Sequence, residues 1–269
     1  MPPRPNTPRV LSIAGSDSGG GAGIQADLKA FARCGVHGMT AITAITAQNT
    51  VAVTGVWPIE PDGIVGQVRA VAEDIGVDAV KIGMLGDAET IAAVDRALDL
   101  VGDAPIVLDP VMVAESGASL LRSDAQAELR ERLLPRASVV TPNVHEAAAL
   151  AEVGEVEAQD VEALARAVHA LGPAAVVVTG GHRDEATDVF YDGGRLVDIP
   201  GERYEGGAAH GSGCTHSSAL AAHLALGFEP LEAARAAKQI AAEAVRDGLV
   251  EVGAGAGPVD VFGLKGRHA

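Results

Sequence analysis

The chain has 269 residues, of which 48% are hydrophobic and 3% aromatic, enough for one large α/β domain with an aliphatic core. A formal net charge of −16 argues against nucleic acid as a partner and favours a soluble cytoplasmic protein. No apolar run has membrane-spanning length, and Cys34 and Cys214 suggest no disulfide framework. We expect residues 1–9 to form a disordered tail and residues 10–269 a single domain.

Short apolar runs alternate with helical segments along most of the chain. Strands are predicted at residues 10–14, 39–44, 51–57, 79–82, 105–108, 138–140 and 174–178. Helices are predicted at residues 24–34, 60–75, 87–100, 125–134, 145–151, 160–171, 217–226 and 230–250. Residues 189–191 and 196–199 flank Asp192-Gly193-Gly194, which predicts an antiparallel hairpin at a sheet edge. The alternation predicts βαβ units and a mainly parallel sheet.

A glycine-rich loop, residues 15–23, lies between the first predicted strand and the first predicted helix. Its glycine spacing fits neither the dinucleotide-binding fingerprint nor the Walker A motif. The glycines would instead let the backbone approach a small substrate closely. Asp27 follows in the first turns of the helix, where it either contacts a ligand or only complements the helix dipole.

Side chains that could contact a ligand lie just after six of the predicted strands. They are Asp17, Gln48, Met84, Asp109, Asn143 and Thr179. Ligands of open parallel sheets bind beyond the carboxyl ends of the strands, so these residues should meet in one cleft. This convergence predicts an enzyme that acts on a small molecule.

A second glycine turn, Gly211-Ser212-Gly213, precedes Cys214 and an alanine-rich helical run. A glycine turn that opens into a helix directs backbone N–H groups at one point, which predicts an anion site. Cys214 would lie in the first helical turn, where the dipole lowers the pKa of a thiol. We therefore expect the turn to hold a transferring phosphate while Cys214 takes a proton from the acceptor hydroxyl. The alternative is a helix cap with a buried, inert cysteine.

Asn143 and Glu146 place an amide at a helix start and a carboxylate one turn later. This pair suits a hydrated Mg²⁺ between phosphates, but the same spacing describes a capping box. Asp109, before Pro110, is either a metal carboxylate or a turn residue. Four histidines lack metal-ligand spacing and are expected to be solvated or capping groups, so zinc is not expected. They are His145, His182, His210 and His216.

Several motifs together resemble the hydroxymethylpyrimidine/phosphomethylpyrimidine kinases of thiamin biosynthesis. They lie at residues 15–29, 47–50, 81–85, 108–112, 141–146, 180–182 and 210–215, and they span nearly the whole chain. The resemblance implies the ribokinase-like fold, in which helices sandwich a mostly parallel sheet. It also implies that Mg²⁺-ATP phosphorylates the pyrimidine hydroxymethyl group, and that the same site then converts the monophosphate to the diphosphate.

The resemblance further implies a role for each matching residue. The pyrimidine would contact Gly15, Asp27, Gln48, Met84 and Val111. The nucleotide would contact Asn143, Thr179, Gly181 and Gly213, and the metal would bind Glu146 and Asp109. The anion hole and base would be Gly211, Ser212, Gly213 and Cys214. Many ribokinase-like sugar kinases carry an aspartate base where this chain has Cys214.

The chain departs from the family pattern at a few positions. Thr179 stands where many relatives have a lysine aimed at the ATP phosphates, so another cation substitutes or ATP binds more weakly. Smaller departures are Ser18, Ala209, Ala254 and Ala256. The nearest alternative function is a pyridoxal or pyridoxine kinase, and a second is a ligand sensor without turnover. Asp27 and Gln48 favour the aminopyrimidine, and similar kinases are often homodimers.

Overall fold

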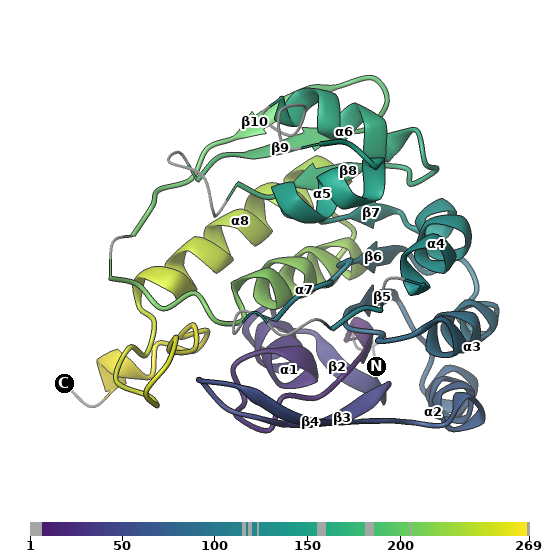
Figure 1. The fold of residues 1–269 in the computed structure, drawn as a ribbon, viewed down its shortest axis with the longest axis horizontal. Coiled ribbons are helices and arrows are strands. Elements are labelled where there is room, and N and C mark those ends of the chain that lie inside the picture. Colours follow the sequence, from purple (N-terminus) through teal and green to yellow (C-terminus); the bar gives the residue numbers. More distant parts are fainter. Residues whose placement is uncertain are drawn as a thin grey trace, which may run out of the picture.

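The computed structural model describes residues 7–114, 117, 120–122, 124–154, 160–180, 186–204 and 206–267. These residues form an eight-stranded sheet of order β10-β9-β8-β7-β6-β5-β1-β2 (Figure 1). The strands are β1 (Arg9–Ala14), β2 (His37–Ile42), β5 (Ala79–Ile82), β6 (Ile106–Leu108), β7 (Val139–Val140), β8 (Val176–Val178), β9 (Asp188–Tyr191) and β10 (Leu196–Ile199). The six strands β8, β7, β6, β5, β1 and β2 are all parallel to one another. At the opposite edge, β9 and β10 form the predicted antiparallel hairpin.

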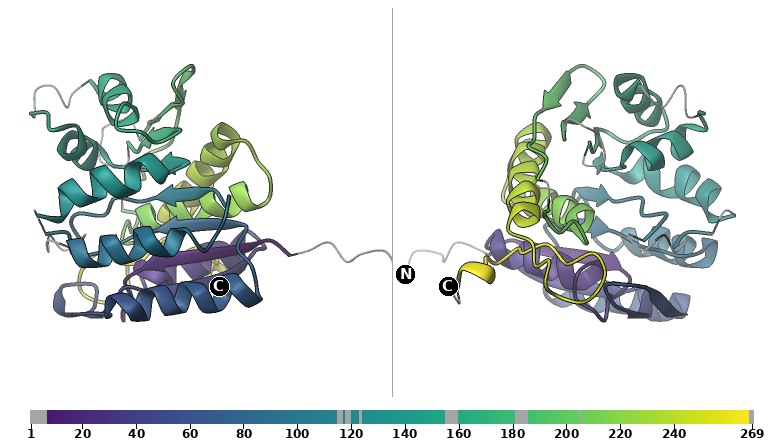
Figure 2. Two further views of the ribbon diagram at one scale, coloured as in Figure 1. Left: turned by 90° about the vertical axis from the view of Figure 1, so that its right-hand side faces the viewer. Right: turned by 60° about the vertical axis from the view of Figure 1, so that its left-hand side comes forward.

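Helices cover both faces of this sheet (Figures 1 and 2). One face carries α1 (Gly23–Arg33), α7 (Ser212–Ala225) and α8 (Pro230–Arg246). The other carries α2 (Pro61–Asp74), α3 (Ala88–Leu98), α4 (Ala125–Glu128), α5 (Val144–Ala151) and α6 (Val161–His169). After α4 the chain continues through a π-helical turn, Leu129–Leu133, and a 3-10 turn, Leu134–Arg136. The predicted three-layer α/β sandwich is confirmed.

The core consists of two apolar layers, one on each side of the sheet. Alternate residues of a strand point to opposite faces, so Leu11 and Ile13 of β1 pack under α2 and α3, whereas Val10 packs under α1 and α7. Both faces of the parallel strands are buried, which explains why these strands read as continuous Val, Ile and Leu runs. The helices α7 and α8 lie side by side on their face and position the start of α7 over the strand ends.

A small second sheet projects beside the main one. Its strand β4 (Val53–Pro58) matches the strand predicted at residues 51–57, but its other strand was not predicted as separate. The sequence suggests one strand over residues 39–44, but β2 ends at Ile42 and a new strand, β3 (Ala44–Gln48), pairs with β4 (Val53–Pro58). The break falls at Thr43, which is fully buried and whose Oγ1 donates to the Met84 carbonyl at 2.8 Å. This hydrogen bond turns the chain away from the main sheet and carries Gln48 towards the strand ends.

Several helices and strands begin or end at residues other than those predicted. Arg9, expected in the N-terminal tail, begins β1 and forms a 2.7 Å ion pair with Asp78. The start of α7 lies at Ser212, five residues before its alanine-rich run, and α8 ends at Arg246 rather than Val250. None of the helices in the described ranges combines the length and the apolar composition needed to cross a membrane.

Candidate active site

A cavity of about 420 Å³ opens where β5, β6, β7 and β8 end beside the start of α7. Most of the predicted site residues line it: Gly15, Gln48, Met84, Asp109, Val111, Asn143, Glu146, Thr179, Gly211, Ser212, Gly213 and Cys214. Asp27 does not border the cavity, and Gly181 lies outside the described residues. The structure therefore brings together residues from seven separate segments. They include five of the six predicted strand-end side chains, whereas Asp17 does not border the cavity. Their contacts with ligands remain predictions.

The glycine turn before α7 forms a cradle of backbone N–H groups. Gly211 caps the helix with φ of 85°, and a Cβ there would lie 1.8 Å from the Gly21 carbonyl oxygen, so no other residue fits. Within the described residues, the N–H groups of Gly213 and Cys214 have no backbone acceptor, as expected for a first helical turn. This end of α7 faces the cavity and can accept an anion.

The thiol of Cys214 borders the cavity, but its pKa differs from the predicted one. Burial raises the pKa of Cys214 to about 12, and the nearby carboxylates of Asp27 and Asp109 add to this rise. The positive charge of Lys81 and a hydrogen bond from the Gly23 N–H oppose the rise but do not outweigh it. The expectation of a lowered thiol pKa is therefore wrong, because a helix terminus cannot compensate for loss of solvent and two neighbouring carboxylates.

A fully buried ion pair lies beneath this thiol. The Lys81 Nζ atom lies 2.9 Å from Asp27 Oδ1 and 3.2 Å from Oδ2, and both side chains are 0% exposed. Asp27 also accepts hydrogen bonds from Ser12 at 2.5 Å and Ser218 at 2.7 Å. Both carboxylate oxygens are thus occupied by protein donors. The contact between Asp27 and a pyrimidine stays a prediction. In this structure the Asp27 carboxylate holds Lys81, which lines the cavity, while Asp27 itself does not border it.

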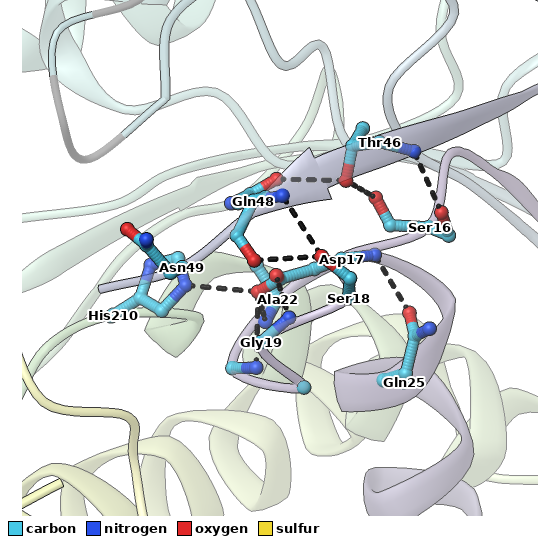
Figure 3. Close-up of polar contacts among 12 residues, drawn as sticks. Ser16, Asp17, Ser18, Gly19, Ala22, Gln25, Thr46, Gln48, Asn49 and His210 are labelled. Carbon is cyan, nitrogen blue, oxygen red and sulfur yellow. Dashed lines mark hydrogen bonds and ion pairs between the residues drawn. The ribbon is translucent and has the colours of Figure 1, made fainter. Parts of the chain in front are cut away.

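Asp17 organises the glycine loop between β1 and α1 (Figure 3). Its Oδ1 accepts from the Gly19 N–H at 2.8 Å, and its Oδ2 accepts from the N–H groups of Gly21 at 3.0 Å and Ala22 at 2.8 Å. The same Oδ2 lies 3.0 Å from Nε2 of His210, the residue before the anion turn. His210 is therefore buried and paired with a carboxylate, not solvated as predicted. One carboxylate joins the two glycine loops that frame the cavity.

One end of the cavity, near β3 and β5, is where we expect the acceptor, and we call it the acceptor end. Its walls fit closely together. A Cβ on Gly15 would lie 2.2 Å from the terminal methyl of Met84, so a glycine is needed for this side chain to lie against the loop. Gln48 is fixed through its backbone, because Ser18 Oγ accepts from its N–H and donates to its carbonyl. These hydrogen bonds give Ser18, one of the departures from the family pattern, a structural role. They also leave the side-chain amide of Gln48 at the cavity.

Asn143 and Glu146 form the capping box that we gave as the alternative to a metal site. Asn143 Oδ1 accepts from the Glu146 N–H, and Glu146 Oε2 accepts from the Asn143 N–H, both at 2.9 Å. The carboxyl of Glu146 also lines the cavity with Asp109. Burial, followed by repulsion from Asp109, raises the pKa of Glu146 to about 8. Two neighbouring carboxyls, Asp109 buried and Glu146 partly buried, that resist ionisation together are suited to a cation, so capping and metal binding are compatible here.

The other end of the cavity, beside β8 and α8, is where we expect the nucleotide, and we call it the nucleotide end. It contains a cluster that the sequence did not reveal. Thr179 lies there, its N–H bonded to the Pro142 carbonyl at 2.8 Å. Asp188, His216 and Lys238 line the same wall. His216 is 4% exposed, which corrects its prediction as a solvated or capping group. One sequence feature could have revealed this cluster: Asp188 is a charged residue beside the apolar run of a predicted strand. A buried charge needs a buried partner.

Comparisons with known proteins show the family of this chain. A family model described as phosphomethylpyrimidine kinase matches residues 17–260. The chain belongs to this family. A hydroxymethylpyrimidine/phosphomethylpyrimidine kinase of Rhizobium meliloti is 52% identical over 260 residues, which is 94% of this chain and 96% of that protein. One of Bacillus subtilis is 43% identical over 260 residues, covering 96% of each chain.

Solved structures with similar folds include pyridoxal kinases and a phosphomethylpyrimidine kinase. Pyridoxal kinase from Staphylococcus aureus, in complex with AMP-PCP and pyridoxal, is 33% identical with a TM-score of 0.85, covering 96% of this chain and 95% of that one. An ADP complex of Bacillus subtilis pyridoxal kinase is 38% identical with a TM-score of 0.87, covering 96% and 99%. Phosphomethylpyrimidine kinase from Clostridium difficile is 40% identical with a TM-score of 0.77, covering 88% and 99%. The fold of this phosphomethylpyrimidine kinase family member is ribokinase-like.

Proposed function

We propose that this family member is an ATP-dependent kinase of thiamin biosynthesis. It phosphorylates 4-amino-5-hydroxymethyl-2-methylpyrimidine and then converts the monophosphate to the diphosphate. One observation carries the proposal: a single cavity contains an anion cradle, a thiol, and a carboxyl pair suited to a cation, in a chain similar to kinases with these substrates in their names. Similar folds in complex with ADP and AMP-PCP support ATP as the phosphate donor.

The chain's own groups supply positioning and charge stabilisation, which is what phosphoryl transfer requires. The acceptor hydroxymethyl group would lie between Gln48, Met84 and the Cys214 thiol. The N–H groups of Gly213 and Cys214 would hold the transferring phosphoryl oxygens. A new bond forms between the hydroxyl oxygen and the γ-phosphorus, the bond to the bridging oxygen breaks, and ADP leaves.

Cys214 would receive the hydroxyl proton during the first phosphorylation. Because its pKa is raised, only a small thiolate fraction exists at neutral pH, and Lys81 stabilises that fraction by its charge. A thiolate with a raised pKa is also a stronger base, which suits the late removal of a proton from an alcohol. In the second phosphorylation the acceptor is already a phosphate and needs little help from a base.

The residues present fit a magnesium ion. Mg²⁺ in kinases takes one or two protein carboxylates, several waters and phosphate oxygens. No group of three or more His, Cys, Asp or Glu among the described residues could hold a metal, so Glu146 and Asp109 would act with the nucleotide. A bound magnesium ion neutralises phosphate charge. Asn143 orients Glu146 for that task through the capping box.

Pyridoxal kinase activity is the second candidate, because several similar solved structures carry that name. The test is turnover with ATP and one of three purified acceptors: hydroxymethylpyrimidine, its monophosphate, and pyridoxal. We expect turnover of both pyrimidines, with a higher kcat/KM than for pyridoxal. Turnover confined to pyridoxal would replace the proposal with the second candidate, and ATP binding without any turnover would indicate a sensor.

We further propose a single domain over residues 10–269, a cytoplasmic location and a homodimer. The exposed apolar side chains Ile45, Val56 and Trp57 on β3 and β4 support the homodimer. Sedimentation of the purified chain tests it: a dimer mass is expected, and a monomer mass at micromolar concentration would refute it. A Trp57→Ser variant, which removes the largest of these side chains, should shift the equilibrium towards monomer.

A further inference from the structure

A buried histidine at the nucleotide end of the cavity lacks hydrogen-bond partners. His216 is 4% exposed, yet neither its Nδ1 nor its Nε2 has a partner among the described residues. A buried polar group without a partner lowers the stability of the folded protein. Such a group in the wall of a ligand cavity points to a partner that arrives with the ligand.

The described residues next to His216 pack around its ring but form no hydrogen bond with its nitrogen atoms. Its Nε2 lies 3.5 Å from Asp188 Oδ2, which also has no hydrogen-bond partner in the described part of the chain. The other oxygen of Asp188 accepts from Lys238 Nζ at 2.6 Å and from the Gly180 N–H at 2.9 Å. The charge of Asp188 is therefore already balanced by Lys238, and His216 can offer a ring N–H elsewhere.

The position of His216 indicates which part of a ligand it meets. It lies one helical turn after Ser212 on the same face of α7, so its ring stands below the anion cradle. Its neighbour Asp188 and the Lys238 that pairs with Asp188 come from β9 and α8, on the opposite side of the cradle from Lys81 and Asp27. The ring is thus at the nucleotide end and away from Gln48 and Met84.

We propose that His216 binds a phosphate oxygen of the nucleotide through a ring N–H, and that Asp188 and Lys238 position its ring. This inference rests on the proposed function, in that ATP is taken to bind at this end of the cavity. A buried N–H donated to a phosphate oxygen is a charge-assisted hydrogen bond, which is stronger than a neutral one. His216 would add a side-chain donor to the backbone donors of the anion cradle.

The test compares the binding of ADP and of adenosine to the full-length protein by isothermal titration calorimetry. His216→Leu should weaken ADP binding about tenfold or more and leave adenosine and hydroxymethylpyrimidine binding unchanged. His216→Gln, which retains a side-chain N–H, should restore part of the ADP affinity. The matched control is His223→Leu on the same helix, since His223 bonds to the Ala219 carbonyl and packs against Phe228 outside the cavity wall.

Unchanged ADP affinity in His216→Leu would overturn the inference, as would an equal loss of ADP and adenosine affinity. If His216→Leu fails to fold, the wild-type protein with ¹⁵N-labelled histidine provides the readout. Its His216 ring signal, assigned with His216→Gln, should shift with ADP and not with adenosine, and an unshifted signal would refute the contact. These experiments measure nucleotide binding and do not measure turnover of pyrimidines. If the kinase assay failed but ADP binding still depended on His216, the proposed function would be rejected and this inference would stand.

Discussion

The two ends of the cavity differ in how completely their polar groups are paired. At the acceptor end, Asp17 and Asp27 are saturated by protein donors, and Lys81 has its counter-ion at 2.9 Å. At the nucleotide end, His216 and one oxygen of Asp188 lack hydrogen-bond partners among the described residues, and Glu146 has a raised pKa. The protein alone satisfies these polar groups at the acceptor end, whereas at the nucleotide end we propose that phosphate and metal would satisfy them.

The largest effect is expected from removing the thiol at the boundary between the two ends. Cys214→Ala should lower kcat of the first phosphorylation about 10²–10⁴-fold, the usual contribution of a general base, and the second phosphorylation much less. In the wild type the first step should also accelerate as pH rises from 7 to 9, because the pKa of Cys214 lies above this range and the small thiolate fraction therefore grows with pH. Separate assays of each purified substrate measure this, and equal losses in both steps would contradict the role.

Lys81→Met should destabilise the acceptor end strongly. It leaves the carboxylate of Asp27 buried without its cation, which costs about 3–5 kcal/mol of unfolding free energy. The double variant Lys81→Met/Asp27→Leu should recover much of this loss. Urea unfolding measures both, with Arg69→Met as control because the Arg69–Glu73 pair is exposed and worth under about 1 kcal/mol. Equal costs for the buried and the exposed cation would show that the pair is not structural.

Asp17→Asn should loosen the glycine loop and spare the nucleotide end. An amide cannot accept at both positions that Asp17 uses, so the bonds to Gly21, Ala22 and His210 weaken. The KM for the pyrimidine should rise about tenfold, the equivalent of about 1.4 kcal/mol, while ADP affinity stays the same. Asp192→Asn is the matched control, since that aspartate caps an exposed glycine turn far from the cavity. A parallel loss of ADP affinity would mean that the two ends are not independent.

Glu146→Gln should raise the Mg²⁺ concentration needed for half-maximal activity. Without metal, the folded protein keeps a proton on Glu146 up to about pH 8, whereas the unfolded chain releases it near its ordinary pKa of 4.5. The free energy of unfolding should therefore fall as pH rises from about 5 to 8, by at most about 1.4 kcal/mol per pH unit. Urea unfolding in EDTA should show a smaller fall for Glu146→Gln, and identical pH profiles would exclude a titrating Glu146.

Local patterns in the sequence predict most of the fold. The buried strand β5 matches its predicted residues 79–82, because a continuous apolar run bounded by turns leaves few alternatives. The separate strand β3 was missed because the break at Thr43 depends on a hydrogen bond to Met84, 41 residues away. Such a contact leaves no local signal in the chain.

The sequence predicted most of the residues that line the site, but not their burial, ion pairs or pKa shifts. Glycines and polar residues after strands identify the cavity wall, since topology alone brings strand ends together. The burial of Asp27, the raised pKa of Cys214 and the pairing of Asp188 with His216 depend on segments distant in sequence. Charge neutralisation and desolvation are properties of the assembled site, so they could not be read from spacing.

The central claim is that the thiol of Cys214 faces the acceptor hydroxyl while the start of α7 holds the phosphate donor. A crystal structure with hydroxymethylpyrimidine and a non-hydrolysable ATP analogue tests it most directly. We predict that Cys214 Sγ lies within hydrogen-bond reach of the hydroxyl oxygen, with the γ-phosphate on the N–H groups of Gly213 and Cys214. A hydroxyl bound away from the sulfur, or a γ-phosphate bound away from this turn, would contradict the account.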